Sequence, residues 1–186
     1  MARTRQCEQR HSMLTAAALT AAVVQAGAAM PVSDDSPARV RSDDARLVVL
    51  IARGIRESPT FQSLTAAIEA TDGLVYVEPG VCPRGGVRAC LRMSVQLSGP
   101  YRLLRISIDT RTDRSDVELI ASIGHELQHA IEGLSERAVT NGVRLYNFFR
   151  RHAPTSGATF ETTAAVHVGH AIRDELKDAE RAAAPR

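Results

Sequence analysis

Apolar side chains recur at helical spacing in the first part of the chain that carries a clear pattern. A helix is predicted over about 43–57, and a second helix starts at Ser58 and Pro59, which suit an N-cap and a first helical position. The second helix is expected to end near Gly73, where glycine can adopt the left-handed cap. The apolar face of the first helix consists of Leu47, Leu50, Ile51 and Ile55.

The hydrophobic period changes to two between residues 74 and 109. The pattern predicts a short strand at 74–80 and two further strands at 91–97 and 104–109. The turn residues 98–100 separate the last two strands, which should therefore form an antiparallel hairpin. Helical spacing then returns from residue 115 to the end, with breaks after Gly133 and at 153–157. The expected fold class is α+β, with a small antiparallel sheet packed on helices.

The first 28 residues have the pattern of a secretory signal peptide. Arginines precede an apolar, alanine-rich run, and Ala26-Gly27-Ala28 supplies a small-residue cleavage site. A membrane anchor is the competing interpretation, but the run is short for a span of about 20 residues and is interrupted by Gln25. We therefore expect a signal at 1–28, a flexible leader at 29–42, one domain at 43–186, and a secreted or periplasmic location without a stable membrane span.

Charge changes when the signal is removed. The whole chain has 23 basic and 21 acidic residues, and the signal contains three arginines and one glutamate. The mature domain would therefore have 23 − 3 = 20 basic and 21 − 1 = 20 acidic residues. A neutral domain does not indicate nucleic acid as a partner.

Two cysteines, Cys82 and Cys90, remain after signal removal. In an oxidising compartment an even pair is expected to form a disulfide. A metal site built on these thiolates is disfavoured, because the spacing is far from C-x2-4-C and no second Cys/His pair lies nearby.

A helix predicted over about 116–132 carries the sequence H-E-x-x-H. It begins with a capping box, Ser115-x-x-Glu118. His125 and His129 share one face beside the apolar stripe, so both imidazoles can reach one zinc ion. Glu126 lies next to the pair, where a carboxylate can act as general base on a water molecule. The alternative is an ordinary buried helix, since so short a motif also arises by chance.

A catalytic zinc normally has a third protein ligand. The last helix separates the candidates, because 161, 165, 168, 172 and 176 fall on one face, which is apolar after Glu161. An unpaired carboxylate facing the core is costly, so Glu161 needs a cation. Zinc would supply it; Arg105 or the helix N-terminus are the alternatives. His167 and His170 are expected to face solvent. The candidates considered are His152, Glu161, His167, His170 and Glu132.

With these residues the chain resembles the zincin metallopeptidases, in particular the gluzincins, whose third ligand is a glutamate. "HELQH" at 125–129 and the later Glu161 carry the resemblance, and "IGHELQHAIE" also resembles small exported bacterial proteins with a zincin-like helix. The resemblance covers about 101–176 and implies a zincin-like domain that binds Zn²⁺. The implied ligands are His125, His129 and Glu161, with Glu126 as general base.

The chain departs from this family in two respects, at Ala165 and in having no residue that is assigned to stabilise an oxyanion. Many gluzincins have an aspartate four residues after the third ligand, where it orients a histidine, and Ala165 occupies that place here. Tyr146 and His152 are the available candidates for stabilising an oxyanion or contacting substrate.

In zincins the strand before the motif helix is often a sheet edge that holds the substrate. Residues 101–110 could bind a peptide by strand addition in this way. Arg102 and Arg105 could favour acidic substrates, but charges on an edge strand also prevent aggregation, and this second interpretation is preferred.

The sequence thus predicts an exported zinc metalloendopeptidase that hydrolyses a peptide or protein substrate. The main alternative is a non-catalytic envelope domain that uses a zincin-like scaffold to bind a partner, with a structural or vestigial metal. A disulfide-stabilised interaction module without metal is the third.

Overall fold

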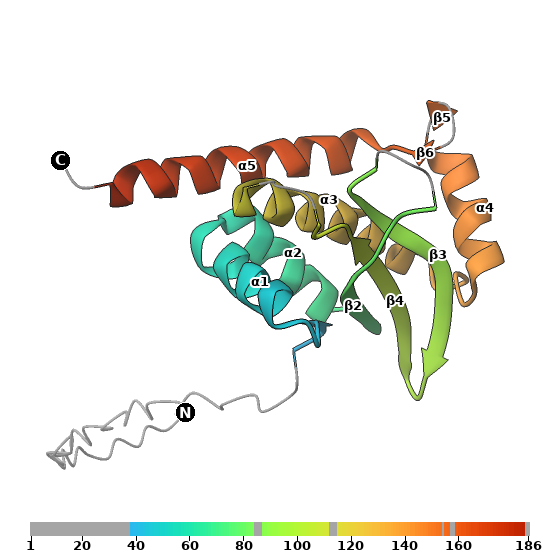
Figure 1. Cartoon of the computed structure of the whole chain (residues 1–186). Helices are drawn as coiled ribbons and strands as arrows, with labels where there is room; N and C mark the ends of the chain where they lie inside the picture. Colours follow the sequence, from blue (N-terminus) through green and yellow to red (C-terminus); the bar gives the residue numbers. More distant parts are fainter. Residues whose placement is uncertain (1–37, 84–86, 112–114, 154, 157–158, 185–186) are drawn as a thin grey trace, which may run out of the picture. The chain divides into compact units, whose positions relative to one another are not determined.

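Pairs of helices and groups of strands follow one another along the chain, which ends with a single long helix (Figure 1). The computed structural model describes residues 38–83, 87–111, 115–153, 155–156 and 159–184. The helices are α1 (Ala45–Glu57), α2 (Pro59–Glu69), α3 (Asp116–Ser135), α4 (Gly142–His152) and α5 (Thr163–Ala183). The strands are β1 (Val40–Arg41), β2 (Gly73–Pro79), β3 (Ala89–Ser98), β4 (Tyr101–Ile108), β5 (Thr155–Ser156) and β6 (Thr159–Phe160). The α+β class is confirmed.

The main sheet is mixed, with the strand order β1-β2-β4-β3. The predicted hairpin is confirmed, since β3 and β4 pair antiparallel around the turn at Gly99. However, β1 and β4 each run parallel to β2. The expectation of an antiparallel sheet is therefore wrong: β4 returns between β2 and β3, which alternation of apolar residues alone does not reveal.

The edge strand next to the motif helix is β3, and β4 lies inside the sheet. The expectation that 101–110 forms a substrate-binding edge is therefore wrong, as is the interpretation of its arginines as edge guards. Arg102 is 3% exposed, pairs with Asp72 and donates to the carbonyl oxygen of Leu134 at the end of α3. Arg105 forms an ion pair with Glu78 on β2. Both arginines thus connect β4 to its neighbours.

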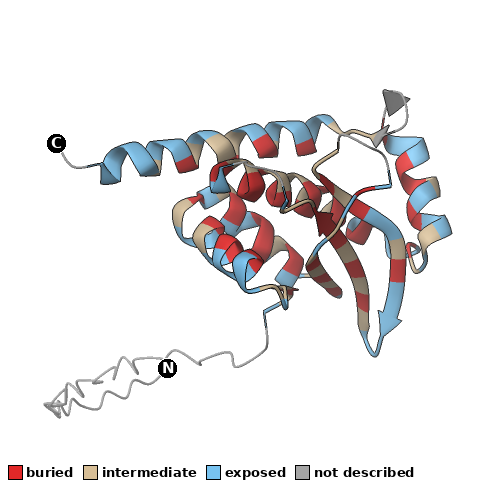
Figure 2. Cartoon of the chain, in the orientation of Figure 1, coloured by how far each residue is buried: buried red, intermediate tan, exposed pale blue. Residues whose placement is uncertain are grey.

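The helix α3 packs against the sheet on one side and against α5 on the other (Figure 1). More residues are buried in α3 than in any other described helix, whereas the outer face of α5 is exposed (Figure 2). The helices α1 and α2 cover α3 from another side, and α4 lies along β3. The core contains Leu47, Phe61, Ile68, Val77, Ile106, Ile120, Leu127, Phe149 and Ile172.

Several predicted helix starts are confirmed. Ser58 accepts a hydrogen bond from the backbone N–H of Phe61 and caps α2, with Pro59 in the first turn. Ser115 accepts from the N–H of Glu118 and caps α3. The Glu118 carboxylate accepts hydrogen bonds from Arg88, which directly precedes β3, and from Arg173 on α5. It therefore connects α3 to both elements.

The motif helix is longer than predicted, because Gly133 does not end it. A Cβ atom at Gly133 would lie 2.6 Å from Cδ1 of Leu145 on α4. Glycine here permits close approach of a neighbouring helix, and α3 continues to Ser135.

The N-terminal predictions lie largely outside the described residues. The signal at 1–28 and most of the leader at 29–42 fall there, but Val40 and Arg41 form β1 and pair with β2. The end of the predicted leader is therefore part of the sheet. Among the described helices, none combines the length and apolar character needed to cross a bilayer.

Candidate metal centre

The two histidines of the motif lie one turn apart on α3. Their rings are 4.9 Å apart between centroids, and the His129 ring also packs edge-on against Phe149 of α4. His129 is 5% exposed and His125 is partly exposed. Burial of their flanks by the sheet and α5 limits the positions that the two rings can take.

Glu161 comes to this pair from a different part of the chain. Its Oε2 atom lies 3.2 Å from Nε2 of His125. One donor atom each from His125, His129 and Glu161 lies within 4.8 Å of the others, and this is the group that could hold a metal ion among the described residues. Close packing of α5 on α3 produces the convergence, since Glu161 directly precedes Thr162, the N-cap of α5.

Glu161 does not lie on the last helix, contrary to the prediction. Glu161 precedes the last helix rather than beginning its apolar stripe, and its side chain is 39% exposed. The stripe itself is real, because Ala165, Ile172 and Leu176 are fully buried. The alternative partner Arg105 is bonded to Glu78 instead.

The three donors fit the coordination preferences of zinc. Imidazole nitrogens and carboxylate oxygens bind Zn²⁺ at about 2.0–2.2 Å, so tetrahedral ligands lie about 3.4 Å from one another. Donor atoms already within 4.8 Å of one another reach that spacing with small side-chain movements. Two neutral imidazoles and one carboxylate leave a fourth position open, which is the composition of catalytic rather than structural zinc sites.

Hydrogen bonding and burial shift the pKa values of two candidate ligands, His125 and Glu161. Burial alone would lower the pKa of His125, but its hydrogen bond to Glu161 and the charge of Glu126 raise that pKa above its ordinary value. The hydrogen bond to His125 correspondingly lowers the pKa of Glu161. A metal ion must displace the proton that this pair shares, so metal binding should release protons.

Glu126 lines the same pocket as His129 and Glu161, and its side chain reaches the edge strand β3. It is 8% exposed, and its Oε2 atom accepts a hydrogen bond of 2.7 Å from the backbone N–H of Leu91 on β3. Burial raises the pKa of Glu126 above the ordinary range of a glutamate. A raised pKa gives this carboxylate a higher affinity for a proton than an exposed glutamate has.

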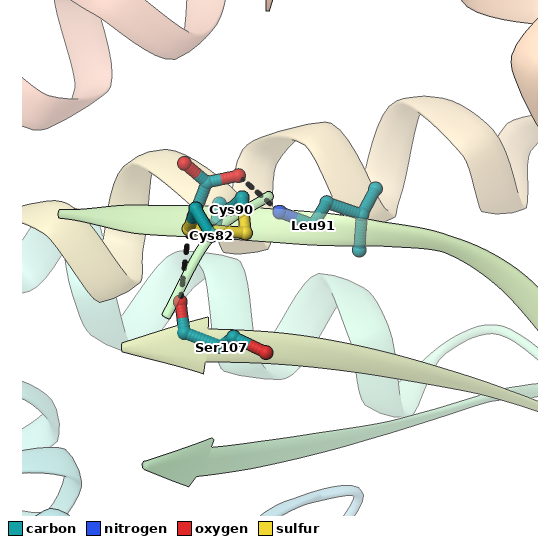
Figure 3. The surroundings of a disulfide bond; sticks show 5 residues. Cys82, Cys90, Leu91 and Ser107 are labelled. Carbon is teal, nitrogen blue, oxygen red and sulfur yellow. Dashed lines mark hydrogen bonds between the residues drawn. A yellow bond between two sulfur atoms is a disulfide. The ribbon is translucent and has the colours of Figure 1, made fainter. Parts of the chain in front are cut away.

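The predicted disulfide between Cys82 and Cys90 is confirmed. It lies immediately before Leu91 on β3, and Cys82 is near the carbonyl oxygen of Ser107 on β4 (Figure 3). The bond therefore holds the start of the edge strand, including the N–H group that contacts Glu126.

A pocket of about 400 Å³ opens beside these residues. One wall is the edge strand from Ala89 to Ser94, and Glu126, His129 and Glu161 line its floor. Aromatic rings also line the pocket, where Phe160 stacks on Phe149 and meets Tyr146 edge-on. The aromatic side chains in the lining are Tyr146, Phe149 and Phe160.

The other candidates lie in different places. Tyr146 lines the pocket and is 47% exposed, whereas His152 is exposed and its Nδ1 contacts the carbonyl oxygen of Phe148. His167 and His170 face solvent, as predicted. Tyr146 thus lies in the same pocket as the candidate metal ligands His129 and Glu161, whereas His152 is not among the residues that line it.

Glu132, considered as a third ligand, instead contacts one. Its Oε2 atom is 3.1 Å from Nδ1 of His129. Hydrogen bonds from His129, Thr162 and Gln128 lower the pKa of Glu132 despite the opposing effect of burial. Sequence reasoning missed this contact, although the i, i+3 spacing from His129 to Glu132 was a usable signal.

The chain matches no protein-family profile, no curated protein and no solved structure.

Proposed function

We propose that this protein is an exported zinc-dependent endopeptidase. The observation that carries the proposal is the convergence of His125, His129 and Glu161 within 4.8 Å, beside a buried glutamate and an open pocket. Two histidines and a glutamate would hold zinc, which when bound supplies Lewis-acid activation of water and of the scissile carbonyl. Export is proposed from the N-terminal pattern and from the disulfide, which suits an oxidising compartment.

Glu126 is the general base in this proposal. Its carboxylate would accept a proton from the attacking water and later deliver that proton to the leaving amine. The buried position that raises its pKa supports this role, because a stronger base accepts a proton from water more readily. The N–H of Leu91 fixes one oxygen of the carboxylate and orients the other.

The edge strand β3 is proposed to bind the peptide main chain. In an antiparallel ladder alternate residues turn their main-chain groups away from the partner strand. Arg88 bonds to Asp109 on the β4 side, whereas Leu91 turns its N–H toward Glu126. Ala89 and Leu91 therefore turn their main-chain groups away from β4, next to the pocket. The N–H of Leu91 is taken by Glu126, so an extended peptide would pair with Ala89 and with the carbonyl group of Leu91.

The pocket indicates a preference for large apolar side chains. Its lining combines Val87, Leu91, Met93 and three aromatic rings. Side chains of this kind gain free energy from burial in such a lining, whereas a charged side chain would lose its hydration. We therefore propose unfolded or extended peptides with bulky apolar residues as the substrate class.

Zinc content and cleavage of an unfolded protein substrate test the proposal together. Wild type should bind about one zinc per chain and cleave, and Glu126→Gln should retain zinc while kcat/KM falls by about 10²–10⁴-fold. Glu69→Gln is the matched control, because it makes the same chemical change at an exposed position on α2. Zinc binding without cleavage by wild type would instead favour a non-catalytic binding domain.

A further inference from the structure

Glu132 has more defined hydrogen-bond partners than a surface glutamate needs. It lies on α3 one turn after His129, and its side chain is 17% exposed. Oε2 contacts Nδ1 of His129 at 3.1 Å, while Oε1 accepts from Oγ1 of Thr162 at 2.8 Å and from Nε2 of Gln128 at 3.3 Å. Both carboxylate oxygens are therefore used within the protein.

The contact with His129 determines which ring nitrogen is free. A carboxylate at Nδ1 keeps the proton on that nitrogen, so Nε2 has its lone pair available. Metal-binding histidines commonly donate their second ring N–H to a carboxylate, which fixes the ring orientation and increases the basicity of the ligand nitrogen. Glu132 is placed to do this for His129.

The contact with Thr162 extends the same constraint to the third ligand candidate. Thr162 is the N-cap of α5, where its hydroxyl oxygen accepts from the N–H of Ala165 and its hydroxyl hydrogen goes to Glu132. Glu161 is the adjacent residue. One carboxylate on α3 thus holds the ring of His129 and the backbone segment that presents Glu161.

We infer that Glu132 is a positioning residue of the metal centre, which orients His129 and fixes the segment of Glu161 through Thr162. The inference rests on the proposed metal-dependent function. It assigns the task of orienting a histidine to a residue of the motif helix itself, whereas Ala165 on α5 has no side-chain group that could perform it.

Zinc affinity of the full chain, measured by competition with a chromogenic chelator, tests the inference. Glu132→Ala should raise the Kd for Zn²⁺ by about 10–100-fold. Glu132→Gln, which can still accept from Nδ1, should restore part of the loss. Glu136→Ala, an exposed glutamate four residues further along the chain, should leave the Kd unchanged.

Thr162 supplies a second, independent arm. Thr162→Val removes the hydroxyl and should weaken zinc binding, whereas Thr162→Ser keeps it and should not. If both residues act through one hydrogen bond, Thr162→Val should raise the Kd for Zn²⁺ by a smaller factor in the Glu132→Ala variant than in wild type. The visible absorption of Co²⁺-loaded Glu132→Ala should keep the intensity of a four-coordinate site, because no ligand is lost.

Three results would overturn the inference. The first is a Kd for Glu132→Ala within threefold of wild type. The second is lower stability of the zinc-free protein with no change in zinc affinity, which would make Glu132 only structural. The third is loss of the four-coordinate Co²⁺ spectrum, which would make Glu132 a ligand. Zinc binding without peptide cleavage would refute the proposed peptidase but not this role, whereas a wild type that binds no zinc would refute both.

Discussion

The contact between α3 and α5 at Gly124 provides a sharp test of how the site is assembled. Gly124 directly precedes His125, and a Cβ atom there would lie 2.1 Å from Cδ1 of Ile172. Carbon atoms in contact are normally about 3.5–4.0 Å apart. Since Ile172 is fully buried, its side chain must move within a packed core to admit even one methyl group.

The magnitude follows from two opposing effects. Replacing glycine by alanine inside a helix gains about 1 kcal/mol. Overpacking a core costs about 1–3 kcal/mol, and the short distance to Ile172 places this contact at the upper end of that range. We therefore expect Gly124→Ala to lower the free energy of unfolding by about 1–2 kcal/mol.

Gly169→Ala is the matched control on the facing helix. A Cβ atom there would meet Cβ and Nδ1 of His125 at 3.5 Å, which is ordinary contact. This variant should gain helix propensity without a clash and be as stable as wild type or more so, by up to about 1 kcal/mol.

Ile172→Val removes the atom that clashes, so it completes a double-mutant cycle. Alone it should cost about 0.5–1.5 kcal/mol. In the Gly124→Ala background it should cost less than this or be stabilising. The assay is urea unfolding of the zinc-free, disulfide-bonded chain followed by circular dichroism. A stable Gly124→Ala variant, or strictly additive effects, would refute the close packing of α3 on α5.

Three further predictions concern other parts of the molecule. Glu118→Gln should destabilise the protein by about 1 kcal/mol at pH 7. The ion pair with Arg173 holds the pKa of Glu118 in the folded protein below its ordinary value. The stabilisation is therefore present above the unfolded-state pKa and is lost as the pH falls through the folded-state pKa. Urea titrations at pH 7 and pH 3 should therefore show the deficit shrinking in acid, and an equal deficit at both would contradict this. Replacing Cys82 and Cys90 by serine should lower stability by about 2.5 kcal/mol and reduce cleavage more than zinc affinity, because the disulfide holds Leu91 against Glu126; unchanged turnover would refute that link. Glu161→Ala should weaken zinc binding strongly while His167→Ala does not, and equal effects in a chelator titration would argue against Glu161 as a ligand.

Helix positions and caps were largely predictable because their signals are local. Leu47, Leu50 and Ile51 of α1 are buried as predicted, whereas Ile55 is exposed. The caps Ser58 and Ser115 are where the sequence pattern places them. The same applies to the two histidines, since a spacing of four residues on any helix puts them on one face. Local periodicity and capping chemistry are sufficient for these features.

Strand order was not predictable, because alternation identifies the buried face of a strand but not its neighbours. The strand at 101–108 therefore looked like an edge, although it lies between β2 and β3. The burial of Arg102 was not predictable for the same reason, because its partners Asp72 and the end of α3 are about 30 residues distant in sequence.

The candidate site was partly predictable. Glu161 was selected for its place on an apolar stripe, yet it meets His125 because the start of α5 packs beside α3. The contacts of Glu126 with Leu91 and of Glu132 with Thr162 join residues about 30 or more positions apart. Such contacts depend on tertiary packing and leave no periodic signal in the sequence.

Anomalous scattering at the zinc edge, from crystals of the protein grown with one equivalent of Zn²⁺, would locate the metal ion itself. We expect one peak, about 2.0–2.2 Å from a nitrogen of His125, a nitrogen of His129 and a carboxylate oxygen of Glu161. Glu126 should not coordinate the ion. A peak at other residues, or no peak at this site, would show that His125, His129 and Glu161 do not form a zinc site.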